Sequence, residues 1–126
     1  MLIFYKTIIQ PVLEYACPVW HTGLTKQDSD LLEQIQRRAM TVLYPTKSYT
    51  AALKEAKLET LSLRRDIICK KFFTKMCKQD HKLNYLLEKR EMPPYDLRHP
   101  QPFNIMIPHT ERYKRSLLMH GLLNYC

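Results

Sequence analysis

Glycine is scarce in this chain, since Gly23 and Gly121 are the only two among 126 residues. Tight hairpin turns need positive φ, which glycine adopts without steric cost. Few positions here meet that need, and the longer charged segments are rich in Lys, Glu, Gln, Leu and Ala, which favour helix. The sequence therefore predicts a mainly α-helical fold, a small bundle of four to five helices.

Proline divides the chain into two parts. Five of the eight prolines fall in one short segment: Pro93, Pro94, Pro100, Pro102 and Pro108. Proline fixes φ and restricts the residue before it, so this segment is expected to be extended or irregular. We expect a helical domain over residues 1–91 and a Pro-rich basic arm over 92–126, with a short terminal helix from Ser116 to Tyr125.

Apolar periodicity predicts where the helices lie and which sides they bury. A first helix over residues 2–16 should be disturbed at Pro11, end at Pro18 and bury a broad face. The next, capped by Thr25 or Asp28 and ended by Pro45, should bury Leu31, Ile35, Ala39 and Val42 and expose a Glu33–Arg37 pair. Further helices are expected over Tyr49 to Ala56 and about Leu61 to Lys78.

The formal charge of +8 is concentrated in the second half. Residues 61–126 contain thirteen Lys or Arg and six Asp or Glu. Such a basic surface suits phosphate-bearing partners, although a solvated helical surface is the simpler alternative. Helical arithmetic places Arg64, Lys71, Lys75 and Lys78 on one stripe. The candidate RNA- or DNA-binding residues are Arg64, Lys71, Lys75, Lys78, Arg37, Arg38, Arg98, Arg112, Lys114 and Arg115.

Two Cys-x-x-x-His pairs are the candidates for metal or thiol chemistry. Cys17 with His21 and Cys77 with His81 could together supply four zinc ligands or a Cys–His nucleophile. Pro18 disrupts the first pair, however, and neither pair has a zinc knuckle. No Gly-rich phosphate loop and no Asp-Asp pair occur in the sequence. We therefore expect no cofactor and no self-contained enzyme.

The cellular location is predicted to be intracellular, cytoplasmic or nuclear. The N-terminal residues lack a basic region and a cleavage site typical of signal peptides. No run reaches the roughly 18 apolar residues that span a membrane. The four cysteines, Cys17, Cys69, Cys77 and Cys126, show no Cys-x-x-Cys spacing and are expected to be reduced thiols.

An ordered set of motifs resembles one protein family. The motifs are QPVLEYACPVW at 10–20, LEQIQRRA at 32–39, LSLRRD at 61–66, YDLR at 95–98 and TERYKRS at 110–116. Together they resemble the segment downstream of the polymerase core in non-LTR, LINE- or Jockey-like retrotransposon reverse transcriptases. The resemblance covers nearly the whole chain.

The resemblance implies a non-catalytic C-terminal fragment of an RNA-directed DNA polymerase. The family's palm aspartates lie N-terminal to this segment, and no Phe/Tyr-x-Asp-Asp motif is present here, so no catalytic residue is carried over. The implied partners are the remainder of the polymerase and template RNA or target DNA. Two alternatives stay open, namely an orphaned helical packing module with an exposed apolar patch, and a zinc- or thiol-dependent protein.

Overall fold

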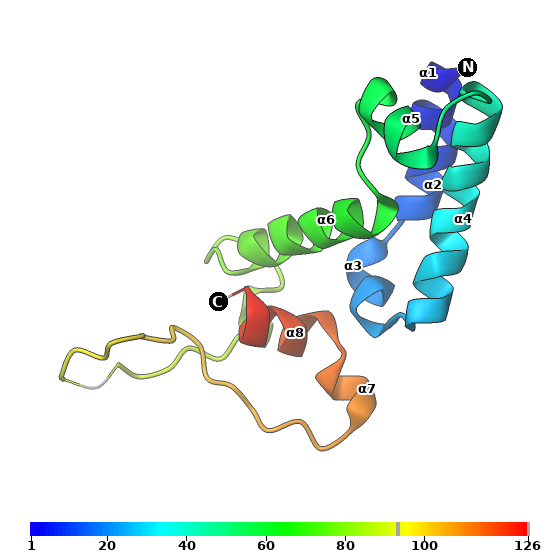
Figure 1. Cartoon of the computed structure of the whole chain (residues 1–126). Coiled ribbons are helices and arrows are strands. Elements are labelled where there is room, and N and C mark those ends of the chain that lie inside the picture. Colours follow the sequence, from blue (N-terminus) through cyan, green and yellow to red (C-terminus); the bar gives the residue numbers. More distant parts are fainter. Residues whose placement is uncertain (93, 126) are drawn as a thin grey trace. The chain divides into compact units, whose positions relative to one another are not determined.

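The chain is mainly helical in a computed structural model that describes residues 1–92 and 94–125 (Figure 1). Helices account for 62% of the residues, which confirms the predicted fold class. The predictions that involve Pro93 and Cys126 lie outside the described residues. The chain forms two compact units, a first unit of Met1–Cys17 with Leu24–Ile68 and a second unit of Pro18–Gly23 with Cys69–Cys126. The boundary expected between residues 91 and 92 stays a prediction.

The first unit is built from an interrupted N-terminal helix and three further helices. Thr25 caps α4 by accepting from the Asp28 amide at 3.1 Å, and Ser48 caps α5 by accepting from the Ala51 amide at 3.4 Å, so both helices begin where expected. The elements are α1 (Leu2–Phe4), the π-helix η1 (Tyr5–Ile9), α2 (Gln10–Glu14), α4 (Lys26–Leu43), α5 (Tyr49–Ala56) and the first part of α6 (Leu61–Met76).

Pro11 stands near the start of α2, directly after the wide turn of η1. Because proline lacks an amide donor and clashes with the preceding turn, a π turn accommodates it without ending the helix. The end expected at Pro18 is wrong. The helix ends at Glu14, Ala16 takes a φ of 51°, and Pro18 falls inside the first turn of α3 (Cys17–Trp20), where its missing donor is not needed.

The broad buried face predicted for residues 2–16 is also wrong. Tyr5 is 2% exposed and packs in a cluster with Met40 and Ala52, whereas Phe4 and Val12 are 54% and 72% exposed. The residues contacting α4 and α5 form a narrow strip, so the remaining apolar positions stay on the surface. The apolar content of this helix therefore exceeds what its own unit covers.

The buried side of α4 likewise differs from the predicted stripe. Gln36 and Met40 are buried, whereas Leu31, Ile35 and Val42 are 52%, 44% and 72% exposed. The predicted apolar stripe and the observed buried residues both have helical spacing. Because Gln36 is polar, the sequence pattern assigns its side of α4 to solvent. By contrast, α5 spans Tyr49–Ala56 as expected, and it buries Ala52, Leu53 and Ala56.

A buried polar network connects the segments of the first unit. The hydroxyl of Tyr5 donates to Oε1 of Gln36 at 2.7 Å. Nε2 of Gln36 donates to the Tyr49 hydroxyl at 3.1 Å and to the Glu59 carbonyl at 3.0 Å. Each end of the amide is thereby satisfied, which buried amides require.

Glu33 belongs to the same network and is not part of an exposed pair. Its carboxylate accepts from the Tyr49 hydroxyl, and its other oxygen accepts from the Leu61 amide at 3.0 Å. The carboxylate therefore satisfies a free amide at the start of α6, where the helix dipole favours negative charge. Arg37 instead lies over the Tyr49 ring, 5.0 Å from its centroid.

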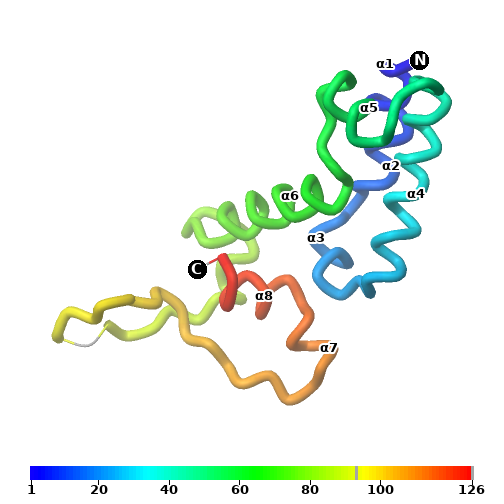
Figure 2. Tube along the Cα trace, viewed as in Figure 1, coloured from blue at the N-terminus to red at the C-terminus, as the bar shows by residue number. Residues whose placement is uncertain are grey.

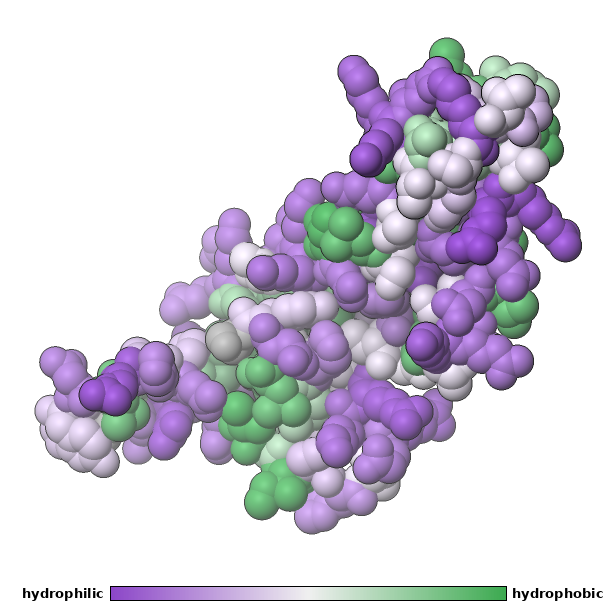
Figure 3. Space-filling view, in the orientation of Figure 1, coloured by the Kyte–Doolittle hydropathy of each residue, from purple (hydrophilic) through white to green (hydrophobic). Residues whose placement is uncertain are grey.

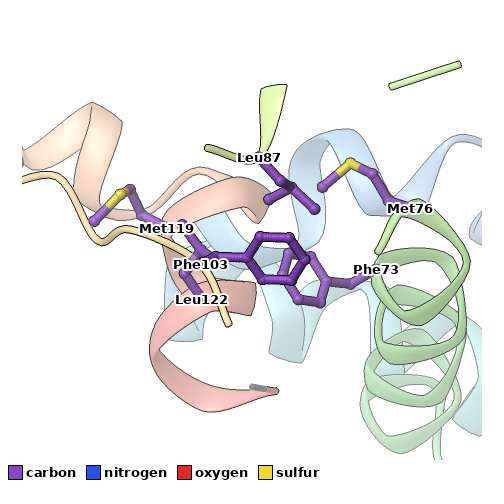
Figure 4. Packing of buried hydrophobic residues seen from close by; sticks show 6 residues of the cluster. All are labelled: Phe73, Met76, Leu87, Phe103, Met119 and Leu122. Carbon is purple, nitrogen blue, oxygen red and sulfur yellow. The ribbon is translucent and has the colours of Figure 1, made fainter. Parts of the chain in front are cut away.

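The second unit surrounds the end of α6 with a core of six buried apolar side chains. Figure 4 shows them converging from α6, from α8 and from two segments without regular helix: Phe73, Met76, Leu87, Phe103, Met119 and Leu122. Gly121 explains how α6 and α8 come so close, since a Cβ atom there would lie 2.3 Å from the Phe73 ring. The other elements are η2 (His21–Gly23), η3 (Asn84–Leu86), α7 (Glu111–Lys114) and α8 (Leu117–Asn124).

The Pro-rich segment is largely irregular but is fastened to this core. Lys89 and Phe103 form an antiparallel bridge, in which the Asn104 amide donates to the Glu88 carbonyl at 2.7 Å. Figure 2 shows residues 90–92 leading away from this bridge and residues 94–102 leading back to it. Phe103 is 8% exposed, and burying such a ring contributes about 1.5–3 kcal/mol. Helix α7, capped by Thr110, was not expected from the sequence.

Candidate nucleic-acid interface

Three exposed lysines lie in the last part of α6 and directly after it. Lys71 and Lys75 lie in the helix and Lys78 in the bend after it, and all three are exposed. At about 100° per residue, Lys71 and Lys75 lie opposite the buried Cys69, Phe73 and Met76. We call Lys71, Lys75 and Lys78 the lysine face. In the part of the chain that the structure describes, no ion pair engages these ammonium groups.

Arg64 follows the same stripe but has a different role. Its Nε and Nη2 donate to the two carboxylate oxygens of Glu14 at 2.5 and 3.2 Å. The hydrogen bond to Glu14 raises the pKa of Arg64 above its ordinary value. A guanidinium held bidentately by a carboxylate is largely occupied. Arg64 therefore joins α2 to α6 inside the first unit, and it is not available for a phosphate without breaking that pair.

Arg37 and Arg38 are exposed neighbours on α4 in the first unit. Together with Gln34, Thr41 and Val42 they border a shallow groove along one helix. Arg37 already stacks on Tyr49, so its guanidinium plane is partly engaged. Arg38 presents its charge to solvent.

The remaining predicted contacts are all exposed and all belong to the second unit. Arg98 lies in the Pro-rich segment, and Arg112, Lys114 and Arg115 lie on or directly after α7. Of the aromatic side chains in the Pro-rich segment, Phe103 is buried in the core. Tyr95 remains 66% exposed.

Two further charged residues, Lys70 and Arg65, are not among the predicted contacts. Lys70 is exposed beside the lysine face, as its position next to Lys71 could have indicated. Arg65 is fully buried, and its Nη2 donates to the Ser29 hydroxyl at 2.9 Å. Its spacing of four residues from both Leu61 and Cys69, which are buried, is the pattern that would have revealed it.

The two Cys-x-x-x-His pairs do not form a metal centre in the structure. No group of three or more His, Cys, Asp or Glu side chains that could hold a metal ion occurs in residues 1–92 and 94–125. Cys17 and Cys69 are buried. His81 packs edge-on against Phe72, with ring centroids 5.8 Å apart, and its Nδ1 accepts from the Leu83 amide at 3.2 Å. The ring contact of His81 is a packing contact, and its hydrogen bond belongs to a turn.

Comparison with known proteins adds no relative, because no protein-family model, curated protein or solved structure matches the chain. Within the described residues, every helix is too short or too polar to cross a membrane.

Proposed function

We propose that this chain is a non-catalytic accessory segment of a retroelement RNA-directed DNA polymerase, and that its lysine face contacts the phosphates of RNA or DNA. The observation that carries the binding proposal is that Lys71 and Lys75 are exposed on a helix whose opposite side is anchored in a core, with Lys78 exposed in the bend after it. A rigid helix holds cations at fixed spacing, which suits contacts to successive phosphates. An intracellular location, cytoplasmic or nuclear, belongs to the same proposal.

The contacts among the family-like motifs support the structural part of the proposal. Glu14 of the first motif pairs with Arg64 of the third, and Glu33 of the second caps α6 at Leu61 of the third. The motif residues thus hold the helices of the first unit together. Phosphate binding is assigned mainly to residues outside them, and catalysis is assigned to none.

The test is binding of the chain to single-stranded RNA and DNA across a salt series. Each lost phosphate contact lowers the log–log salt slope by about 0.7 on single strands. Lys71→Gln should show that decrease, whereas Arg64→Gln should keep the slope and instead lower the free energy of unfolding. Absence of affinity at low salt, or an unchanged slope with Lys71→Gln, would overturn the proposal.

A second candidate is a helical packing module without a nucleic-acid role. The exposed Leu31, Ile35 and Val42 on α4 favour it, because large apolar surfaces are typical of docking sites. This candidate predicts no salt-dependent affinity for RNA or DNA. It also predicts that Ile35→Gln weakens association with the polymerase body, which pull-down against that body would measure.

A further inference from the structure

The turn that follows α6 presents a tyrosine ring to solvent. Tyr85 is the middle residue of η3 and is 78% exposed. The chain on either side of it is anchored, because Leu87 is buried in the core of the second unit and Leu83 packs against that core. Tyr85 is therefore an exposed ring on a turn that the core holds from both ends.

The side chain of Asn84 fastens this turn to the end of α6. Its Nδ2 donates to the Met76 carbonyl at 3.1 Å and to the Cys77 carbonyl at 3.2 Å. Carbonyls in the last turn of a helix lack partners within the helix, so these hydrogen bonds satisfy them. In the sequence, Met76 and Cys77 stand between the second and third lysines of the lysine face. Tyr85 thus directly follows a residue that contacts the lysine-bearing end of α6.

The segment that contains both features is strongly basic. Residues 70–90 contain seven Lys or Arg and two Asp or Glu. The surface in Figure 3 is mostly hydrophilic, and its hydrophobic patches are separate from one another. A partner of this segment is therefore held by cations and by a single exposed ring. Such a region suits a polyanion, because each phosphate contact releases condensed counterions.

The ring of Tyr85 is available for stacking. Within residues 1–92 and 94–125, the aromatic and cation–ring contacts involve other rings. Proteins that bind single strands combine cations along the phosphates with aromatic rings on which bases stack. In a duplex the bases are stacked on one another, so a ring on the protein surface cannot reach their faces. The lysine face and Tyr85 together therefore match a single strand.

We propose that Tyr85 stacks on a base of a single strand whose phosphates contact the lysine face, and that the chain consequently binds single-stranded RNA or DNA in preference to a duplex. This inference rests on the proposed function, and it adds the strandedness of the partner and a residue that contacts bases. Every base has a π face, so the stacking contact tolerates any sequence.

The first test is fluorescence anisotropy of the full chain with single-stranded RNA, single-stranded DNA and a duplex of the same length. The wild-type chain should prefer both single strands. Tyr85→Leu should weaken single-strand binding about 5- to 150-fold, the range typical of one lost stacking contact, and should not change duplex binding. Tyr85→Phe keeps the ring and should keep the affinity. Unchanged single-strand affinity with Tyr85→Leu, or equal weakening on the duplex, would overturn the proposal.

The matched control is Tyr95→Leu, because Tyr95 is also exposed in the second unit but lies in the Pro-rich segment. It should leave the single-strand affinity unchanged, and a loss equal to that of Tyr85→Leu would contradict a specific role for Tyr85. Circular dichroism shows whether each variant is folded. A strand of abasic sites keeps its phosphates but has no bases to stack, so the wild-type chain and Tyr85→Leu should bind it equally. Weaker binding of Tyr85→Leu to the abasic strand would also overturn the proposal.

A salt series separates base stacking from phosphate binding. Tyr85→Leu should lower the single-strand affinity by the same factor at every salt concentration, because it removes no phosphate contact, whereas Lys71→Gln should lower the slope. If Lys71→Gln lowers the slope and Tyr85→Leu changes nothing, the stacking proposal is wrong and the proposed phosphate binding stands. Absence of affinity at low salt would overturn both.

Discussion

Gln36 uses both ends of its side-chain amide inside the first unit, where it is fully buried. Its partners are 31, 13 and 23 residues away in the sequence. No local pattern could have predicted such contacts, since a glutamine in an amphipathic helix is usually assigned to solvent. The helix caps at Thr25 and Ser48, by contrast, were predictable because their partners lie three residues away.

Replacing Gln36 with leucine should lower the free energy of unfolding by about 2–4 kcal/mol. The change leaves the buried hydroxyl of Tyr5 and the carbonyl of Glu59 without their partner, and unpaired buried groups are costly. Urea denaturation measures the effect. The matched control is Gln34→Leu on the exposed side of α4, expected within about 0.5 kcal/mol of wild type. Equal effects of both substitutions would mean that the network contributes little.

The buried tyrosines should make stability depend on alkaline pH. Burial raises the pKa of Tyr5 to about 12, and burial together with the hydrogen bond to Glu33 raises the pKa of Tyr49. The ordinary value is about 10. Between pH 10 and about 12 the folded chain therefore holds protons that the unfolded chain releases. The free energy of unfolding should be unaffected by these groups below pH 10 and fall as the pH rises through that window.

Ultraviolet absorbance of the phenolates checks this expectation directly, since the chain has eight tyrosines. Tyr5→Phe should remove one late-titrating group from the folded chain. If all tyrosines ionise together near pH 10 while the helical circular dichroism persists, the burial of Tyr5 and Tyr49 is wrong.

Helix positions were easier to predict than helix orientations. Periodicity located α4, α5, α6 and α8 to within a few residues, because proline, capping residues and apolar spacing are local features. The buried side was misassigned where a polar residue faces the interior, as with Gln36 on α4. Which side of an amphipathic helix is covered depends on its neighbours, and a single sequence does not contain that information in local form.

Contact between α6 and α8 depends on the absence of a side chain at Gly121. Gly121→Ala should destabilise the chain by about 1–3 kcal/mol, because a Cβ atom would overlap the buried Phe73 ring and overpacking outweighs the gain in helix propensity. Thermal unfolding measures this loss of stability. At Gly23 nothing lies within 4 Å of a Cβ atom, so Gly23→Ala is the matched control and should be neutral or slightly stabilising. A neutral Gly121→Ala would contradict the described packing.

Across the whole molecule, the excess of positive charge is concentrated in the second unit. The second unit contains eleven Lys or Arg and five Asp or Glu, against nine and seven in the first unit. The sequence predicted this bias and all three residues of the lysine face. It could not predict that Glu14, 50 residues away, engages Arg64, because only the fold brings those two residues together. The candidate interface therefore becomes smaller than the predicted stripe and lies within one unit.

The most direct test of phosphate binding through the lysine face compares two triple variants that remove the same charge from different surfaces. One replaces Lys71, Lys75 and Lys78 with glutamine, and the other replaces the exposed Lys26, Lys54 and Lys57 of the first unit. Affinity for single-stranded RNA is measured across a salt series. Binding through the lysine face predicts that the first variant lowers the log–log slope by about 2 and that the second leaves it unchanged. Equal slopes for the two variants would contradict binding through the lysine face.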